Sequence, residues 1–249
     1  ENAIKIHNDT KGQNPLDVAD ETKTRRIALS ELQFYIREKV SVHVEVDATA
    51  PKNDGFSITR KGDEIFIKSA SSVGVLYGAF ALIRLQEIGK MPKKGSTIVD
   101  IPSSPLRLLN HWDNLNGTIE RGFAGRSIWK WEEIPAGKGP MPSSLRARYE
   151  EYGRINKAYG INGTVLNNVN AKPIALSSDM LKKTAKIADV LRPYGIKVYL
   201  SVNFASPKAL GDLDTADPLD ARVPQWWQKK VKEIYRLIPD FGGFLVKAR

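Results

Sequence analysis

Apolar positions in the first hundred residues switch between helical spacing and strand spacing. From Leu16 to Arg37 they recur every three or four residues, which predicts an amphipathic helix. A second helix is predicted from Ser71 to Ile88, because Gly89 follows directly after its end. Alternating strands are predicted over residues 42–46, 56–59, 64–67 and 98–101, with a hairpin turn at 61–63. We therefore expect one α/β unit over this part of the chain.

After Leu106 the pattern becomes a repeated succession of strand, loop and helix. Strands are predicted over residues 106–111, 163–166, 197–202 and 243–246, and helices over 148–159, 178–191 and 225–237. Two of the helix-to-strand links share the sequence Tyr-Gly-Ile, in which the glycine ends a helix and a buried strand follows. Alternating strands and helices require a parallel sheet covered by helices.

Two architectures fit such a sheet, the doubly wound sheet and the eight-fold barrel. Neither the G-x-G-x-x-G nor the G-x-x-x-x-G-K-S/T phosphate-binding motif occurs. This argues against a doubly wound sheet of the nucleotide-binding kind. Polar clusters follow every strand, as they do in barrels, but only four strands are present. The predicted fold class is α/β. An N-terminal α+β domain over residues 1–104 precedes the first four βα units of a (β/α)8 barrel over residues 105–249, truncated at half a barrel.

Composition and charge argue against several classes of site and partner. The chain has no cysteine and only three scattered histidines, so we expect no disulfide and no metal site. Its net charge of +10 is spread out, without a basic stripe, so no nucleic-acid partner is expected. No apolar run is long enough for a membrane span, and the first ten residues lack a signal-peptide pattern, which implies that any signal has been removed or never existed. The absent cysteines favour a periplasmic or secreted location, with the cytoplasm as the alternative.

The polar residues after the predicted strands suggest a ligand. In a barrel the carboxyl ends of the strands converge on one mouth. An indole covers the apolar face of a sugar, amides bond its hydroxyls, and a lysine suits an anionic group. Taken one at a time, an asparagine after a strand is more often a turn or cap residue, and a tryptophan is more often core. The residues concerned are Trp112, Asn167, Asn168, Asn170, Asn203 and Lys247.

A long loop with several glycines, from Gly117 to Trp129, follows the first of these strands. Loops of this kind at a barrel mouth usually carry function. Its charged residues also allow a purely structural interpretation. We expect Glu120 to pair with Arg121 or Arg126 and so to hold the loop.

Three segments resemble glycoside hydrolase family 67, the α-glucuronidases. Leu108 to Asn114 with Ile119 to Trp129 is similar to the family's first barrel strand and loop, Ile161 to Ala171 to its second strand, and Gly242 to Ala248 to its fourth. The first hundred residues also look like the family's accessory domain, which resembles that of hexosaminidases through the segment Gly74 to Ala79. The resemblance covers the whole chain.

This resemblance implies inverting hydrolysis of α-1,2-linked (4-O-methyl)glucuronic acid from xylo-oligosaccharides derived from glucuronoxylan, without a cofactor. Trp112 would pack on the glucuronic acid ring, Val169 would line the pocket, and Lys247 would bind the carboxylate. We also expect four residues to bind the substrate, only because they lie at the predicted barrel mouth: Asp113, Arg121, Asn168 and Asn203. The oligomeric state stays open.

The family's catalytic carboxylates do not fall within this chain. An inverting glycosidase needs a carboxylic acid and a carboxylate base roughly 6.5–9.5 Å apart. In the family the acid is a glutamate a few residues beyond the Lys-Ala of the fourth strand, and the bases lie on later strands. We therefore expect no catalytic residue here and no hydrolysis by the chain alone.

Two other functions compete with this one. A non-catalytic carbohydrate-binding fragment would keep the sugar site without the chemistry, although a stand-alone module should close its own sheet edges. Another glycosidase with the same accessory domain, such as a hexosaminidase, is a further alternative. The motif Asn167-Asn168-Val169-Asn170 does not suit that enzyme.

Overall fold

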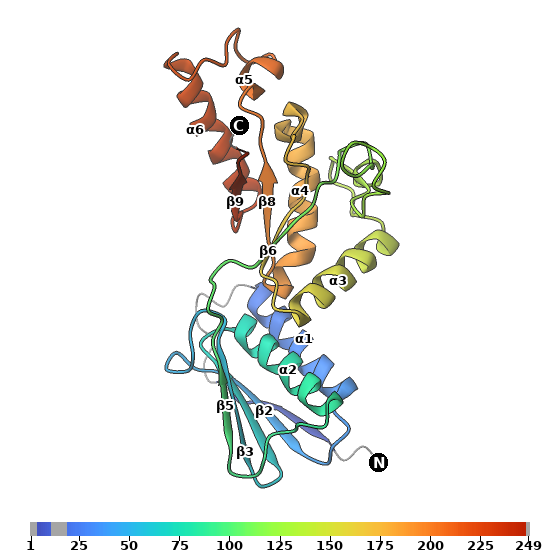
Figure 1. Ribbon diagram of the computed structural model, residues 1–249, viewed down its shortest axis with the longest axis vertical. Coiled ribbons are helices and arrows are strands. Elements are labelled where there is room, and N and C mark those ends of the chain that lie inside the picture. The colour runs from blue at the N-terminus through green and yellow to red at the C-terminus, as the bar shows by residue number, and fades with distance from the viewer. Residues whose placement is uncertain (1–3, 11–18, 248–249) are drawn as a thin grey trace. The chain divides into compact units, whose positions relative to one another are not determined.

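The computed structural model describes residues 4–10 and 19–247, in two compact units (Figure 1). The first unit comprises the chain up to Leu106 together with residues 156–160 and 193–195. The second comprises residues 107–155, 161–192 and the chain from Ile196 onwards. Each unit has its own sheet, so the α/β class predicted from the sequence is confirmed.

The first unit is a five-stranded sheet with two helices. The strand order is β1-β2-β4-β3-β5, with β1, β2 and β4 parallel and β3 antiparallel to both of its neighbours. The strands are β1 (Lys5–Asn8), β2 (Ser41–Val46), β3 (Phe56–Lys61), β4 (Glu64–Ser69) and β5 (Thr97–Asp100), and the helices are α1 (Ala19–Tyr35) and α2 (Ser72–Glu87). The predicted hairpin is confirmed, and it turns at Gly62 with a φ of 62°.

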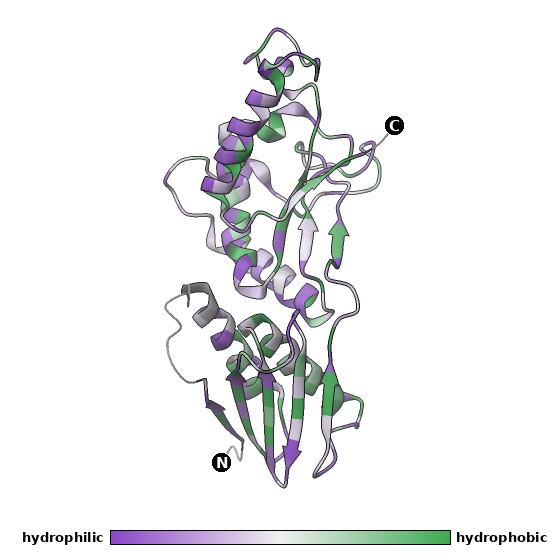
Figure 2. Ribbon diagram, turned by 90° about the vertical axis from the view of Figure 1, so that its left-hand side faces the viewer, coloured by the Kyte–Doolittle hydropathy of each residue, from purple (hydrophilic) through white to green (hydrophobic). Residues whose placement is uncertain are grey.

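One face of this sheet carries the core of the first unit. Val44, Ile58 and Ile67 are fully buried, and they belong to one apolar cluster with residues of α1 and α2. The alternation of apolar and polar residues along the strands is visible in Figure 2. Helix α2 approaches the sheet closely, because a Cβ atom at Gly78 would lie 2.5 Å from Cγ2 of Ile67. A larger residue at position 78 would therefore separate the two layers.

The second unit is built on a parallel sheet whose four strands follow chain order, β6-β7-β8-β9. The strands are β6 (Leu108–Asn110), β7 (Gly163–Val165), β8 (Lys197–Ser201) and β9 (Gly243–Leu245). The helices are α3 (Ser143–Ala158), α4 (Ser178–Leu191), α5 (Ser206–Ala209) and α6 (Arg222–Leu237), with short 3-10 helices η1 (Trp131–Glu133), η2 (Pro173–Leu176) and η3 (Arg192–Tyr194). The predicted succession of strands and helices is confirmed.

Helices of the second unit cover one face of its sheet (Figure 2). Register places Thr164 and Phe244 on the same face. The Thr164 hydroxyl bonds Tyr152 of α3 at 2.9 Å, and the Phe244 ring meets Trp227 of α6 edge-on at 6.4 Å. A doubly wound sheet would carry helices on both faces, so these contacts do not favour it.

The structure corrects several predicted boundaries. Helix α3 begins at Ser143 rather than Arg148, and α6 begins at Arg222 rather than Gln225. Pro224 lies in the first turn of α6, where its missing N–H is tolerated, so it does not delay the helix. Strand β1 was not predicted, because its sequence Lys-Ile-His-Asn contains a single apolar residue and so shows no alternation. The predicted start of the first helix at Leu16 lies outside the described residues, and no described helix is long and apolar enough to span a membrane.

Candidate functional site

The carboxyl ends of all four strands of the second unit lie along one edge of its sheet. The strands are parallel, and the register pairs Asn110 with Val165, Val165 with Tyr199, and Tyr199 with Gly243. The segments that leave this edge carry the predicted binding residues: Trp112 and Asp113 after β6, Asn168 and Val169 after β7, Asn203 after β8, and Lys247 after β9. Any site built from them would therefore lie beyond this edge.

Trp112 is held through its backbone. Its carbonyl oxygen accepts one hydrogen bond from the Glu120 backbone N–H at 2.8 Å and another from Asn168 Nδ2 at 3.1 Å. The residue is 41% exposed. The loop after β6 and the end of β7 thus fix the main chain of Trp112, while part of its surface stays accessible.

Lys247 is joined to the end of β7 as well. Its Nζ donates to Asn170 Oδ1 at 3.0 Å, and the Asn170 backbone N–H donates to Asn168 Oδ1 at 2.8 Å. Val169 lies between the two asparagines in the sequence and is half-buried. A continuous series of hydrogen bonds therefore runs from Trp112 to Lys247 through Asn168 and Asn170. It brings residues from the ends of β6, β7 and β9 together.

Asn167 and Asn203 bond the backbone of neighbouring segments. The Asn167 amide donates to the carbonyl of Ser201 at 3.0 Å and accepts from the N–H of the same residue at 2.8 Å. Asn203 Nδ2 donates to the carbonyl of Ala171 at 3.1 Å, and its Oδ1 accepts from the N–H of Ala205 at 2.9 Å. Asn203 therefore takes the turn role that a lone asparagine after a strand suggests, whereas Asn167 links the end of β7 to β8. The proposed contact between Asn203 and a sugar stays a prediction.

Asp113 is a buried carboxylate. It accepts a hydrogen bond from the Ser127 hydroxyl at 2.5 Å, and its other oxygen lies 3.5 Å from Nδ1 of His111. Burial raises the pKa of Asp113, but the hydrogen bonds from His111 and Ser127 outweigh burial and hold this pKa below its ordinary value of 3.8. Only 3% of the residue is exposed, so Asp113 is a buried anion with a structural role. The contact with a sugar predicted for it stays a prediction.

A group of aromatic residues supports the end of β6, and the sequence did not single it out. His111 Nε2 lies 2.7 Å from the Tyr152 hydroxyl, and the fully buried Trp129 ring contacts His111 edge-on at 5.5 Å. Burial raises the pKa of Tyr152 to about 12, which keeps this phenol neutral. The pattern of apolar positions on α3 could have shown which side of the helix is buried, but not that its tyrosine would meet a histidine.

Arg121 projects from the loop, and its side chain is 81% exposed. Its Nε lies 3.5 Å from Glu120 Oε1, which confirms the structural pair expected within this loop. Glu120 has a φ of 57°, in the left-handed region that residues with a side chain seldom adopt. The substrate contact predicted for Arg121 stays a prediction.

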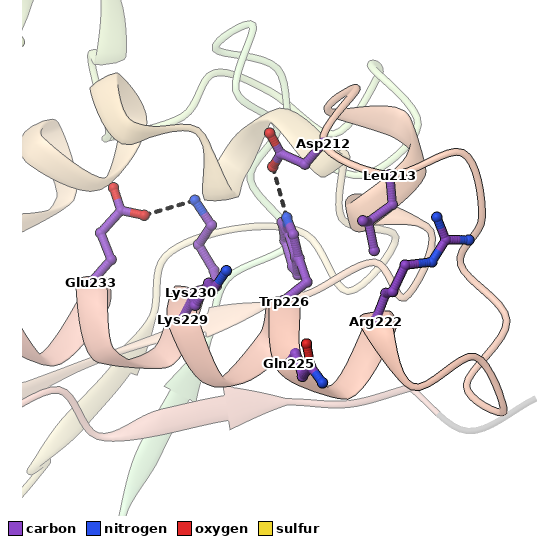
Figure 3. Close-up of a pocket in the computed structure, with 8 residues that line it drawn as sticks. All are labelled: Asp212, Leu213, Arg222, Gln225, Trp226, Lys229, Lys230 and Glu233. Atoms are coloured by element: carbon purple, nitrogen blue, oxygen red, sulfur yellow. Dashed lines mark hydrogen bonds and ion pairs between the residues drawn. The ribbon is translucent and has the colours of Figure 1, made fainter.

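The second unit also has a pocket of about 460 Å³ between α6 and the segment that precedes it (Figure 3). It is lined by Asp212, Leu213, Arg222, Gln225, Trp226, Lys229, Lys230 and Glu233. The Trp226 indole donates to Asp212 at 2.7 Å, and Lys230 Nζ donates to Glu233 at 2.8 Å. The bond from Trp226 to Asp212 joins α6 to the preceding segment, and the Lys230–Glu233 pair lies within α6, so these polar groups have partners without a ligand.

Comparison with known families identifies the family of this chain. The sequence profile of the glycosyl hydrolase family 67 middle domain matches residues 88–249. The chain belongs to glycosyl hydrolase family 67. The match includes β6 to β9 and every predicted binding residue.

Curated relatives of this family 67 chain are much longer. The alpha-glucuronidase of Hypocrea jecorina is 43% identical over 203 residues, a match that covers 79% of this chain and 23% of that protein. Alpha-glucuronidase A of Emericella nidulans is 39% identical over 201 residues, with the same two shares. The family 67 chain thus spans about a quarter of the length of these relatives.

Solved structures share its fold at low sequence identity. A GH138 enzyme targeting pectin rhamnogalacturonan II superposes with a TM-score of 0.56 at 18% identity, covering 96% of this chain and 30% of that one. A GH115 4-O-methyl-alpha-glucuronidase with specificity for decorated arabinogalactans gives a TM-score of 0.53 at 14% identity, covering 94% and 34%. At these identities the likeness concerns the fold alone.

Proposed function

We propose that this chain forms part of the substrate-binding region of an α-glucuronidase. The observation that carries the proposal is the series of hydrogen bonds joining Trp112 to Lys247 through Asn168 and Asn170. It supports a site with an aromatic surface and a cation within one hydrogen-bonded group of residues. The substrate is a uronic acid, because a sugar carboxylate matches an ammonium group and a sugar ring matches an indole.

The reaction we propose is the inverting hydrolysis of α-1,2-linked (4-O-methyl)glucuronic acid from glucuronoxylan-derived oligosaccharides. Trp112 stacks on the uronic acid ring, Val169 borders it, and Lys247 binds its carboxylate. Asn170 Oδ1 orients the ammonium of Lys247 through their 3.0 Å hydrogen bond. The chain's residues bind and orient the substrate. Proton transfer belongs to two carboxyl groups placed roughly 6.5–9.5 Å apart, which we assign to residues after position 249.

The architecture we propose for the second unit is the first half of a (β/α)8 barrel, over residues 105–249. Consecutive strands lie side by side, and α3 and α6 contact the same face of the sheet, which is how a barrel is wound. Residues 1–104 form the accessory domain. We place the protein outside the cytoplasm, secreted or periplasmic, in keeping with the absence of cysteine.

Binding of glucuronate to the 249-residue chain tests the site. Titration monitored by NMR should show saturable binding, and Lys247→Ala should weaken it about tenfold, the usual size of a lost charge-assisted hydrogen bond. Lys229→Ala, which removes an exposed lysine from the pocket on α6, is the matched control and should change nothing. Glucose, which has no carboxylate, should bind equally to the native chain and to Lys247→Ala. Equal glucuronate affinity in native chain and Lys247→Ala would remove the role given to Lys247.

An assay of hydrolysis tests whether the catalytic carboxylates lie outside these 249 residues. The chain alone should release no glucuronic acid from aldouronic oligosaccharides, whereas protein that also contains the downstream residues of its reading frame should release it with inversion. Release by the chain alone would contradict the placement of the catalytic carboxylates. A folded, extended protein without activity would contradict the proposed reaction.

A further inference from the structure

Asn168 is buried and uses its side-chain amide entirely within the protein. Its Nδ2 donates to the carbonyl oxygens of Trp112 at 3.1 Å and Glu120 at 3.3 Å. Its Oδ1 accepts from the backbone N–H of Asn170 at 2.8 Å. An amide NH₂ group has two hydrogens, so both are taken. Asn168 therefore has no donor left for a sugar hydroxyl, although its position at the strand end predicts a substrate contact.

Glu120 is the residue whose backbone this arrangement holds. Its φ of 57° costs a residue with a Cβ atom about 1 kcal/mol or more, so surrounding contacts have to maintain it. Its carbonyl accepts a second amide hydrogen, from Asn114 Nδ2 at 2.8 Å. Its N–H donates to the carbonyl of Trp112 at 2.8 Å. Two asparagines from different strand ends thus converge on one strained peptide beside Trp112.

We propose that Asn168 and Asn114 form an amide clamp that sets the orientation of Trp112, and that Asn168 is a positioning residue rather than a sugar ligand. The clamp consists of these two side-chain amides, the Glu120 carbonyl and the Trp112 carbonyl. This inference rests on the proposed function, because it assigns Trp112 the stacking surface for a uronic acid. Its structural part, the dependence of Trp112 on Asn168, can be measured without any ligand.

The adjacent Asn167 provides a matched control for Asn168. Both are asparagines after β7, and both are almost fully buried. The amide of Asn167 bonds Ser201 of β8, whereas that of Asn168 bonds the loop after β6. Replacing either by aspartate keeps the side-chain shape and replaces the NH₂ donor with an anionic oxygen. Only Asn168→Asp turns that oxygen toward the carbonyls of Trp112 and Glu120.

Fluorine NMR of the chain labelled with 5-fluorotryptophan tests the clamp. The chain has five tryptophans, and Trp112→Phe identifies the resonance of Trp112. Without ligand, Asn168→Asp should shift or broaden this resonance and leave the other four in place. Asn167→Asp should leave the Trp112 resonance unchanged. In a glucuronate titration, Asn168→Asp should weaken binding about fivefold, because a displaced Trp112 ring stacks less closely on the sugar.

An unchanged Trp112 resonance in folded Asn168→Asp would overturn the clamp. If Asn168→Asp fails to fold, Asn114→Ala removes the other amide in a less buried part of the loop and should shift the same resonance, while no shift would again overturn the proposal. Glu120→Gly should leave the resonance in place, because glycine adopts a positive φ without support. A native chain that binds no glucuronate, yet shows the expected shift in Asn168→Asp, would refute the proposed function and leave the clamp intact.

Discussion

The two sheets of this chain are stabilised in different ways. The strands β2, β3 and β4 of the first unit are six residues long, and the alternation of their side chains builds an apolar core. The strands β6, β7 and β9 of the second unit have three residues each. There, polar side chains beyond the strand ends continue the pairing. Substitutions in the core of the first sheet should therefore cost the most stability, and those at the edge of the second should mainly change local geometry and binding, except at its buried carboxylate Asp113.

The largest effect is expected from Ile67→Ala in the first sheet. Ile67 is fully buried beneath α2, and truncating such a side chain leaves a cavity that costs about 3 kcal/mol of unfolding free energy. Urea unfolding followed by circular dichroism measures the loss. Val99→Ala on the exposed side of β5 is the control and should cost less than about 0.5 kcal/mol. Similar losses in the two variants would contradict the alternation of buried and exposed positions.

Asp113→Asn should destabilise the second unit by about 1–3 kcal/mol at neutral pH, because the hydrogen bonds from His111 and Ser127 then lose an anionic acceptor. The folded pKa of Asp113 lies below 3.8, so its contribution is present above the unfolded pKa and is lost as pH falls through the folded one. Unfolding free energies measured from pH 7 down to pH 2.5 should converge for the two proteins. A constant difference across this range would show that ionisation of Asp113 is not responsible.

A smaller effect is expected from Asn170→Ala at the edge of the second sheet. The substitution removes the acceptor that orients Lys247, but it leaves the charge of Lys247 in place. Glucuronate affinity should fall about threefold, less than in Lys247→Ala, while the unfolding free energy stays within about 0.5 kcal/mol. Calorimetric titration of the three proteins measures this order. If Asn170→Ala weakens binding as much as Lys247→Ala, then Asn170 itself contacts the ligand.

The smallest effect is expected from Arg121→Ala. Its pair with Glu120 is exposed, and exposed ion pairs contribute about 0–1 kcal/mol, so stability should change little. Affinity for glucuronate should stay within about twofold of the native value, in contrast to the substrate contact predicted from its position in the sequence. A clear loss of affinity in the titration would establish that contact.

The sequence predicts the elements of this fold better than the polar contacts of its candidate site. The spacing of apolar residues and the glycines that end helices predict β7, α4 and β8 to within one residue. The spacing is informative because it shows directly which positions of a helix or strand face the core. Polar residues after strands are ambiguous, because an asparagine can bond the nearby backbone or a ligand. Asn168 and Glu120 lie 48 positions apart in the sequence, and no local pattern encodes their contact. The left-handed backbone of Glu120 is equally hidden, since glutamate has no preference for it.

Asn167 reproduces, with a side chain, the donor and acceptor pair of a peptide group. Its amide meets the N–H and C=O of Ser201 as a further residue of β7 would. The Leu166 N–H still donates to the Tyr199 carbonyl at 3.1 Å, so the main chain can turn away from β8 after Leu166 while the side chain of Asn167 extends the hydrogen-bond ladder by one more pair. The side chain needs both a peptide-like amide and the length of asparagine. Glutamine is one methylene longer and would displace the two hydrogen bonds to Ser201. Amide hydrogen exchange at Ser201 should accordingly be as slow as inside the strands.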